Sequence, residues 1–592
     1  MFSKVLIANR GEIAVRIART CRELGVATVA VYSDLDAEAR HVAMADEAAR
    51  LPGESAADTY LNLPAVLEAA RRTGAEAIHP GYGFFSERGD VAETVQEAGL
   101  VWIGPHPEAT RAVGDKVRAR QLASRAGVSV VPGTLQAVQE PAEVHAFGEA
   151  HGYPIAIKAA GGGGGRGLRV AAGPEEVPEA FAAATREAEA WFGSPGVYLE
   201  RYLERPKHVE VQVLAPAPGE AMWLGARDCS LQRRHQKLVE ETPPPLHAGI
   251  VPAMGEAAVA VANACGYVNA GTVEFLVDAD GQFYFLEVNA RLQVEHTITE
   301  EVLGLDLVAG QLRIAAGEPL GFSRDALPEP RGHAIECRIN AENPARRFLP
   351  GPGRIERYRE PGGIGVRVDS GYAEGDEVPR AYDSLLAKLV VWAPTREEAR
   401  RRMLRALREF DVAGVPTTIP AHLLLLDHPE FVDGSYTTRT VESGALDSLV
   451  GRATPAGTGA PSAATGPSAS GSGDGATGEG AAPDAALSQA AVLLVAGQAV
   501  RLWNPAMAAE AAASTATRTA SGDGVVRSPM HGTILKLEVG KGDRVEAGDT
   551  VAILEAMKME TQVSAPVSGS VTAVRVRAGE VVEDGDPIAE LG

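Results

Sequence analysis

A break in composition at about residue 451 limits how this chain can fold, because it divides the 592 residues into unlike regions. Residues 451–480 read GRATPAGTGAPSAATGPSASGSGDGATGEG, which has too few apolar side chains to bury a core. We therefore expect a flexible linker over residues 447–524. The length of the chain also exceeds what one hydrophobic core organises, so three or four domains are expected in total.

The region before the linker, residues 1–446, alternates apolar strands with longer helical stretches. KVLIANRG (4–11), for example, leads into EIAVRIARTCRELG (12–25). This alternation predicts an α/β domain. Inside the linker region, AAVLLVAGQAVRLW (490–503) is apolar enough to be either a strand packed on a neighbouring domain or a segment that docks on a partner.

The region after the linker, residues 525–592, contains an internal repeat with an offset of 37 residues. The matching pairs are Pro529 and Pro566, Gly532 and Gly569, Val539 and Val576, Gly542 and Gly579, Val545 and Val582, Glu546 and Glu583, and the Gly-Asp pairs at 548–549 and 585–586. Two copies of about four short strands predict a small flattened β-barrel with pseudo-twofold symmetry.

ILEAMKME (553–560) places Lys558 between two methionines at the junction of the two repeats, where we expect a protruding hairpin. Only nine of the 56 basic residues are lysines, so arginine has replaced lysine wherever the two are interchangeable. A guanidinium cannot serve as an acylatable nucleophile, and each remaining lysine is therefore a candidate for a specific role. The position of Lys558 predicts an amine that a modifying enzyme can reach.

A run of five glycines lies between two strand-like stretches in YPIAIKAAGGGGGRGLRV (153–170). No helix and no GK[ST] follows, which excludes both a dinucleotide fingerprint and a P-loop. The bare backbone of such a loop can close over phosphates, and Lys158 on the entering strand would add a cation. The sequence thus predicts a phosphate-binding flap.

GTVEFLVDADGQFYFLEVNAR (271–291) predicts a hairpin with a two-residue type I′ turn at Asp280-Gly281. In that register Glu274 lies opposite Glu287, an unfavourable pairing that a divalent cation would relieve. Asn289 projects to the same face, and these oxygen ligands suit Mg²⁺ or Mn²⁺.

The next stretch, NARLQVEH (289–296), continues at strand period and places Arg291, Gln293 and Glu295 on one face. A guanidinium, an amide and a carboxylate side by side predict a small-anion site next to a base. DCSLQRRHQK (228–237) and HAIECRIN (333–340) add Lys237 and Arg338, whose ordinary explanation would be salt-bridged surface.

Bulk properties exclude several classes of protein. The formal net charge of −22 opposes nucleic acid or an anionic membrane as the main partner. The sequence has no apolar run long enough to cross a bilayer and no signal-peptide pattern. The four cysteines form no CxxC pair, which argues against structural zinc and, with the other features, predicts a cytoplasmic protein.

Together these motifs resemble the biotin-dependent carboxylases. Residues 1–446 are similar to the biotin carboxylase domain, an ATP-grasp fold, along IANRGEIA, HPGYGFFSE, GDK, IKAAGGGGGRG, RDCSLQRRHQK, FLEVNARLQVEH, GHAIECRINAE and YDSLLAKL. EAMKM and the repeat resemble the biotinyl carrier domain. Lipoyl domains share the repeat, but their lysine usually follows Asp and lacks the flanking methionines. The fold class implied is α/β (α+β), with an N-terminal subdomain 1–113, a lid 130–205, a catalytic part 206–446, the linker, and an all-β carrier domain 525–592.

The resemblance also implies roles for single residues. Those implied to bind ATP are Lys116, Lys158, Gly164, Gly165, Glu200, Arg201, Tyr202, Leu203, His208, Gln232, His235, Glu274 and Glu287. Those implied to bind bicarbonate are Lys237, Arg291, Gln293 and Val294, with Glu295 as the base, Arg338 as the contact to the biotin oxygen, and Glu274, Glu287 and Asn289 as metal ligands. The family often has lysine where this chain has Arg201, so this chain departs from the family's pattern there and would present a guanidinium instead of a side-chain amine to adenine.

The implied function is the ATP-dependent carboxylation of biotin on Lys558 with bicarbonate, in the α subunit of an acyl-CoA carboxylase. The implied cofactors are covalent biotin, ATP and Mg²⁺ or Mn²⁺. The implied partners are a biotin protein ligase and a separate carboxyltransferase β subunit in a hetero-oligomer, with acetyl-CoA or propionyl-CoA as acceptor. Three alternatives stay open: another acyl-CoA acceptor, an ATP-grasp ligase that joins a carboxylate to an amine, and a carrier with a degenerate ATPase.

Overall fold

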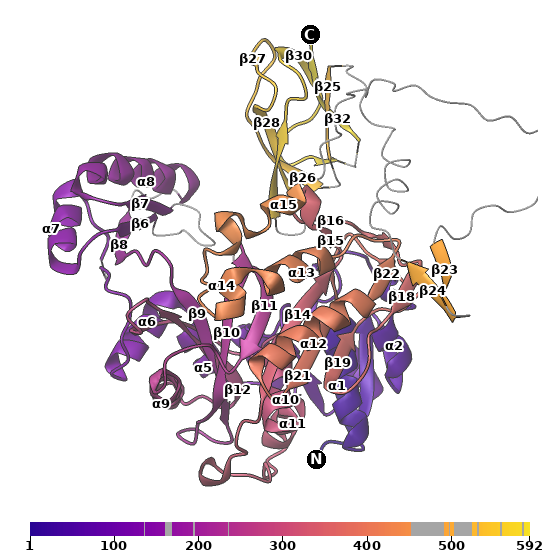
Figure 1. Cartoon of the computed structure of the whole chain (residues 1–592). Helices are drawn as coiled ribbons and strands as arrows, with labels where there is room; N and C mark the ends of the chain where they lie inside the picture. Colours follow the sequence, from indigo (N-terminus) through magenta and orange to yellow (C-terminus); the bar gives the residue numbers. More distant parts are fainter. Residues whose placement is uncertain are drawn as a thin grey trace, which may run out of the picture. The chain divides into compact units, whose positions relative to one another are not determined.

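The computed structural model (Figure 1) describes residues 1–450, 491–495, 498–502 and 524–592, with gaps at 135, 160–167, 193–195, 235, 530–531, 557–558 and 583–584. The chain forms two compact units, Met1–Pro455 and Ala456–Gly592. Within the predicted linker, β23 (Ala491–Val495) and β24 (Gln498–Leu502) pair as an antiparallel hairpin, so the apolar segment there consists of strands. In the described parts of the chain, no helix combines the length and apolar character needed to cross a membrane.

The first unit, Met1–Pro455, begins with a parallel sheet of order β3-β2-β1-β4-β5. Its strands are β1 (Lys4–Ile7), β2 (Ala27–Tyr32), β3 (Glu47–Arg50), β4 (Ala77–His79) and β5 (Val101–Trp102). The helices are α1 (Gly11–Glu23), α2 (Arg40–Met44), α3 (Leu63–Thr73), α4 (Gly89–Glu97), α5 (Pro107–Gly114) and α6 (Lys116–Arg125). Because β1 and β4 are parallel neighbours, the loops that follow them meet at one edge of the sheet.

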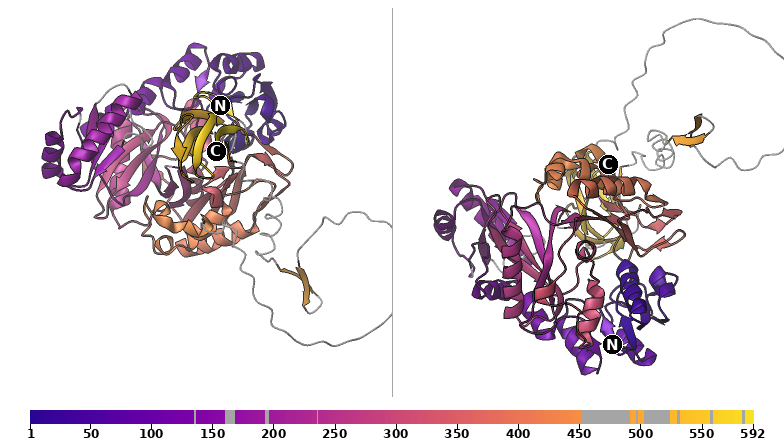
Figure 2. Two further views of the ribbon diagram at one scale, coloured as in Figure 1. Left: turned by 90° about the horizontal axis from the view of Figure 1, so that it is seen from above. Right: turned by 60° about the horizontal axis from the view of Figure 1, so that its bottom comes forward.

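The lid is a three-stranded sheet of order β7-β6-β8 with two helices. Its elements are α7 (Pro141–His151), β6 (Ile155–Ala159), β7 (Leu168–Ala171), α8 (Val177–Phe192) and β8 (Val197–Arg201). β6 and β7 are antiparallel, as the flap interpretation requires, although the glycine run between them lies outside the described residues. Figure 2 shows the N-terminal elements (indigo) and the lid (purple) as separate lobes of the unit.

The centre of the unit is an antiparallel sheet of order β13-β12-β9-β10-β11-β14-β21-β19. Its strands are β9 (Lys207–Ala215), β10 (Met222–Arg233), β11 (Gln236–Thr242), β12 (Asn269–Val277), β13 (Phe283–Asn289), β14 (His333–Asn340), β19 (Val366–Ser370) and β21 (Leu385–Ala393). Its helices are α9 (Ile250–Ala264), α10 (His296–Leu303), α11 (Leu307–Ala315), α12 (Arg396–Glu409), α13 (Ile419–Asp427), α14 (Pro429–Asp433) and α15 (Asp447–Val450). Short pairs complete it: β15 (Glu342–Asn343) with β16 (Leu349–Pro350), β17 (Gly353–Arg354) with β20 (Glu377–Val378), and β18 (Arg357–Arg359) with β22 (Asp411–Ala413).

The C-terminal unit confirms the predicted barrel and its symmetry. Its strands are β25 (Val525–Arg527), β26 (Gly532–Leu537), β27 (Arg544–Val545), β28 (Thr550–Ala556), β29 (Met559–Ser564), β30 (Gly569–Val574), β31 (Val581–Val582) and β32 (Pro587–Leu591). They form two sheets, β25-β32-β30-β27 and β29-β28-β26-β31. Exchanging each strand for its counterpart four places along converts one order into the other, and β26 lies 37 residues before β30, as the repeat predicts.

The hairpin of β12 and β13 corrects the predicted turn. The loop closes through Asp278, whose amide donates to the Gln282 carbonyl, and only Gly281 of the loop has a positive φ (79°). A type I′ turn needs two such residues, so the connection is instead a three-residue loop. A bulge between Glu274 and Phe275 then restores the register, and Glu274 pairs with Glu287 as predicted.

Candidate active site

Lys237 on β11 lies at the centre of a group of buried carboxylates. Its Nζ donates to Glu295 Oε1 (2.6 Å), to Glu210 Oε2 (2.7 Å) and to Glu274 Oε1 (3.1 Å). The Lys237 side chain is 11% exposed, and Glu210 and Glu295 are fully buried. Burial alone would lower the pKa of Lys237, but the acidic groups around it raise that pKa well above its usual range.

Arg227 on β10 is a second cation that binds one of these carboxylates, Glu210. Its Nε donates to Glu210 Oε1 (2.5 Å), and its Nη1 donates to Gln212 Oε1 (2.8 Å) and Thr299 Oγ1 (2.9 Å). Arg227 is fully buried, so its charge is balanced inside the protein. A buried carboxylate held by two cations in this way is rigid, because removing one partner leaves an uncompensated charge.

Glu295 is a carboxylate with three basic side chains around it, Lys237, Arg338 and Arg227. Its second oxygen accepts a hydrogen bond from Arg338 Nη2 (3.0 Å), and Arg338 also pairs with Glu240 (2.6 Å). Burial would raise the pKa of Glu295, yet Lys237, Arg338 and Arg227 outweigh it and hold that pKa well below its usual range. Glu295 is therefore ionised, and the neighbouring cations stabilise its charge.

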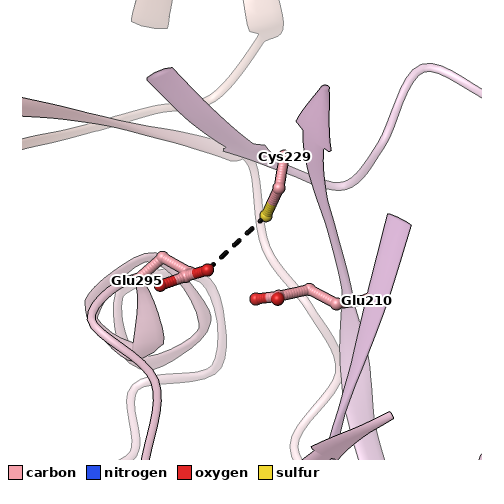
Figure 3. A group of neighbouring side chains, drawn as sticks. All are labelled: Glu210, Cys229 and Glu295. Atoms are coloured by element: carbon pink, nitrogen blue, oxygen red, sulfur yellow. Dashed lines mark hydrogen bonds between the residues drawn. The ribbon is translucent and has the colours of Figure 1, made fainter. Parts of the chain in front are cut away.

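Three buried groups in Figure 3, Glu210, Cys229 and Glu295, place their ligand atoms within 4.8 Å of one another. The Cys229 thiol donates to Glu295 Oε1 (3.7 Å). Both carboxylates are already neutralised by Lys237 and Arg227, and burial raises the pKa of the thiol well above its usual range. The trio therefore lacks the free negative charge of a metal site and belongs to the ion-pair network.

The paired carboxylates of β12 and β13 differ in their surroundings. Glu274 is buried and accepts from His208 Nε2 (2.8 Å) and Asn289 Nδ2 (2.9 Å). Glu287 is 36% exposed, with Oε2 3.6 Å from Lys116 Nζ, and burial together with Glu274 raises its pKa. Opposed carboxylates beside an amide oxygen form a set of hard ligands, and a divalent cation would remove the repulsion that raises the pKa of Glu287.

The segment after β13 is not a strand, which corrects the predicted strand period. β13 ends at Asn289, and residues 290–295 form a bend and a turn that lead into α10. Arg291 nevertheless lies beside Gln293, because its Nη1 donates to Gln293 Oε1 (2.7 Å), and Gln293 Nε2 donates to Glu274 Oε1 (3.2 Å). Arg291 and Gln293 are thus brought together by a bend and turn rather than by a strand.

The residues implied to bind ATP divide between the lid and the central sheet. Lys158 and Arg120 both pair with Glu200, the latter at 2.5 Å, and Arg201 Nη1 donates to Tyr284 OH (3.3 Å). His208 and Gln232 are buried in the central sheet, and Tyr202 and Leu203 follow β8 half-buried. Gly164, Gly165, His235 and Lys558 lie outside the described residues.

Glu210, Arg227 and Glu240 contact the predicted residues but were missed in the sequence. Glu210 had a detectable signal, because KHVEVQVLA alternates His208, Glu210 and Gln212 with valines, which indicates a strand with one polar buried face. Arg227 and Glu240 have no such signal. Arg227 contacts Thr299, which is 72 residues away in the sequence, and Glu240 contacts Arg338, which is 98 residues away. Local sequence spacing cannot predict contacts over such separations.

Comparisons with known proteins fit this geometry. Residues 1–110 match "Biotin carboxylase, N-terminal domain", residues 115–322 "Carbamoyl-phosphate synthase L chain, ATP binding domain", residues 336–443 "Biotin carboxylase C-terminal domain", and residues 524–591 "Biotin-requiring enzyme". A biotin carboxylase of Nostoc sp. is 50% identical over 442 residues, which are 74% of this chain and 99% of that protein. The biotin-dependent acyl-coenzyme A carboxylase alpha3 subunit of Mycobacterium leprae is 45% identical over 586 residues. This match covers 95% of this chain and 94% of that protein.

A solved structure agrees. The biotin carboxylase domain of the Hydrogenobacter thermophilus 2-oxoglutarate carboxylase, in complex with MgADP, ADP and bicarbonate, is 46% identical with a TM-score of 0.69, covering 76% of this chain and 99% of that one. The chain belongs to the biotin carboxylase family. It carboxylates biotin with ATP and bicarbonate, uses Mg²⁺, and carries a biotinyl domain at its C-terminal end. This outcome leaves no place for the alternative of a carboxylate–amine ligase.

Proposed function

We propose that the chain is the α subunit of an acyl-CoA carboxylase, which carboxylates biotin on its own Lys558 and delivers the carboxyl group to a separate carboxyltransferase β subunit. The observation that carries this proposal is the 45% identity to an acyl-coenzyme A carboxylase α subunit over nearly the whole of both chains. Acetyl-CoA or propionyl-CoA is the proposed acceptor. A 2-oxo acid is the second candidate, because the carboxylase domain of a 2-oxoglutarate carboxylase is 46% identical.

In this proposal the lid and the central sheet hold ATP between them. Lys116 and Lys158 bind phosphate oxygens with Gly164 and Gly165, while Glu200, Arg201, Tyr202, Leu203, His208, Gln232 and His235 surround the nucleotide. Glu274, Glu287 and Asn289 would hold Mg²⁺, which supplies neutralisation of phosphate charge when bound. Lys158 must leave Glu200 to reach a phosphate, and closure of the lid provides that exchange.

Bicarbonate binds beside the base. Lys237, Arg291, Gln293 and the Val294 backbone orient it, and their two cations neutralise its charge. Glu295 then takes the bicarbonate proton as an oxygen of the anion bonds to the γ-phosphorus and the bond to ADP breaks. The low pKa of Glu295 keeps this base ionised over the whole neutral range.

Biotin, when bound, supplies a ureido nitrogen that accepts the carboxyl group. Arg338 is the residue proposed to contact its ureido oxygen, and Glu240 holds the guanidinium in place for that contact through Nε (2.7 Å). Glu295 accepts a hydrogen bond from Nη2 of the same guanidinium at 3.0 Å, and this nitrogen also lies 2.6 Å from Glu240 Oε1. Base and oxygen-binding group are therefore one hydrogen-bonded unit.

The division into a carboxylase domain (1–446), a linker (447–524) and a carrier domain (525–592) is part of the proposal, as are modification of Lys558 by a biotin protein ligase and assembly into a hetero-oligomer. The pairing of Ala556 on β28 with Met559 on β29 supports the attachment site, because Lys558, which lies outside the described residues, is between these two residues in the sequence. A cytoplasmic location is also proposed, and the four free cysteines fit a reducing compartment.

The test measures both half-reactions separately. The purified biotinylated chain with ATP, Mg²⁺, bicarbonate and free biotin should release ADP only when bicarbonate is present, and it should leave acetyl-CoA and propionyl-CoA untouched. A carboxyltransferase that co-purifies with the chain from its own cells is then offered acetyl-CoA, propionyl-CoA, pyruvate and 2-oxoglutarate. Transfer to an acyl-CoA supports the proposal, and transfer to a 2-oxo acid selects the second candidate.

A further inference from the structure

Lys388 on β21 is a buried lysine to which the proposed reaction assigns no role. It is 0% exposed, and its partner across the ladder on β14 is Arg338. Its Nζ donates to the backbone carbonyl of Val294 (2.9 Å) and lies 3.2 Å from Glu12 Oε2. The ammonium therefore reaches from β21, between β14 and β19 in the central sheet, to the turn that carries the bicarbonate residues.

The turn itself has few backbone hydrogen bonds. The Gln293 carbonyl accepts from His296, both from its amide (3.3 Å) and from Nδ1 (2.8 Å), which ties the turn to the helix it begins. The Val294 carbonyl has its partner in Lys388, 94 residues away. This carbonyl belongs to the peptide that joins Val294 to Glu295, so its direction fixes where the Glu295 side chain leaves the backbone.

Glu12 connects the ammonium to the N-terminal lobe. Glu12 lies near the start of α1 and also accepts a hydrogen bond from the Tyr82 hydroxyl. The loop of Tyr82 is fixed in turn by Asn9, whose Nδ2 donates to the carbonyls of Pro80 and Tyr82 (2.7 Å each). Three segments from distant parts of the chain thus converge on one ammonium group.

We propose that Lys388 is a positioning residue for the carboxylation of biotin: it orients the Val294–Glu295 peptide and ties the bicarbonate turn to the N-terminal lobe through Glu12. The inference rests on the proposed role of Glu295 and extends it to a residue outside the site. The choice of residue type supports it, since only nine of the 56 basic residues are lysines. A fully enclosed ammonium can donate to a carbonyl and a carboxylate at once, whereas the larger guanidinium is planar and rigid.

The test compares Lys388→Met with a matched control, Lys207→Met. Lys207 is also a largely buried lysine of the central sheet, paired with Asp228 at 2.9 Å, but it does not touch the bicarbonate turn. In biotin-stimulated ATP cleavage, Lys388→Met should raise KM for bicarbonate about tenfold or more and lower kcat by ~10–100-fold, because small displacements of a reacting group are costly. KM for ATP should change less than about threefold by the same reasoning, since the nucleotide contacts are untouched.

A second variant separates positioning from folding. Lys388→Met leaves Glu12 without its cation, and the double variant Glu12→Gln/Lys388→Met removes both charges and should regain melting temperature without regaining bicarbonate KM. Lys207→Met should lower the melting temperature and leave bicarbonate KM near that of the wild type. The proposal is overturned if Lys388→Met keeps the wild-type bicarbonate KM, or if the double variant recovers it.

Failure of the underlying function would look different. An active Glu295→Gln enzyme would reject the proposed base, whatever Lys388 does. An inactive Glu295→Gln enzyme together with a kinetically normal Glu12→Gln/Lys388→Met enzyme would reject the positioning role alone.

Discussion

The central sheet and the C-terminal barrel are both built of antiparallel strands with apolar cores, but only the central sheet also buries charged side chains among the described residues. The central sheet encloses Arg227, Lys388 and several carboxylates with little or no exposure. In the barrel, the buried core consists of Val526, Ile534, Leu554, Ile588 and similar apolar residues, and no charged side chain is buried among the described residues of 524–592. Chemistry and transport are thus assigned to differently constructed regions.

The difference has a physical reason. A charge buried in protein is costly unless it is paired, so a network such as Lys237 with three carboxylates holds its geometry tightly. A carrier needs no such network, since its task is to present one side chain. We therefore expect substitutions of the charged residues bonded to Lys237 to change catalysis and stability together, and substitutions in the barrel to change either one or the other.

The largest expected effect is in the barrel. Lys558→Arg should abolish biotin attachment completely, because a guanidinium stays charged and cannot serve as the amine that is acylated. The melting temperature and the carboxylation of free biotin should stay unchanged, because the substitution leaves the central sheet intact. Intact-protein mass spectrometry after expression with a biotin ligase measures the adduct, with Lys541→Arg as the matched control. Biotin remaining on the Lys558→Arg chain would reject the attachment site.

The next effect is in the sheet. Glu287→Gln should lower ATP turnover by roughly 10²–10³-fold or more, since it removes a metal ligand. The fold should persist, because the change relieves the repulsion from Glu274 across the ladder. Steady-state ADP release is the measurement. The control is Glu256→Gln, because Glu256 is an exposed carboxylate that pairs with Arg324. Full activity at ordinary Mg²⁺ concentrations would show that Glu287 does not hold the metal.

A core substitution in the barrel should separate stability from catalysis. Ile534→Ala should destabilise the barrel by about 2–4 kcal/mol, the usual cost of a cavity in an apolar core. Val581→Ala, at a side chain that is 60% exposed, should cost less than about 0.5 kcal/mol. Hydrogen exchange read by mass spectrometry reports each region, and free-biotin carboxylation should be unchanged. If Ile534→Ala slows that reaction, the two regions are not independent.

The smallest effect concerns pH. Burial would raise the pKa of Glu241, but hydrogen bonds from His333 (2.7 Å) and Arg396 (2.8 Å) lower it to about 2. Because the folded pKa lies below the unfolded value of about 4.3, Glu241 stabilises the fold above that pH and loses its contribution as pH falls towards 2. The contribution is about 3 kcal/mol at neutral pH. The stability difference between wild type and Glu241→Gln should therefore shrink between pH 5 and pH 3, and a constant difference would contradict this.

The sequence predicted features that depend on local pattern. The 37-residue repeat yielded the barrel symmetry, and the alternation around Glu274 and Glu287 yielded their pairing. The pairing is right although the turn is not, because a bulge in the hairpin compensates for a loop that is one residue longer. The Asp280-Gly281 pair predicted a two-residue type I′ turn, and the chain instead forms a three-residue loop in which only Gly281 has a positive φ.

Features that depend on distant contacts could not be predicted. The segment 290–295 has a polar period of two, which strands and turns can both produce. Leu292 in this segment is buried in the core cluster that also contains Ile13 and Ile17 of α1, residues far away in the sequence. Glu240 contacts Arg338 across two strands that are 98 residues apart in sequence. Lys388 could be singled out as a rare lysine, but its contact to Val294 required the fold.

The division of labour between sheet and barrel is tested most directly with labelled bicarbonate on the intact biotinylated chain. With ATP and Mg²⁺, the wild-type chain should acquire acid-labile label on its own biotin, and Glu287→Gln should acquire almost none. Lys558→Arg should acquire none on protein but should still label free biotin at the wild-type rate. Label on the Lys558→Arg chain, or loss of its free-biotin reaction, would contradict the assignment of chemistry to the sheet and transport to the barrel.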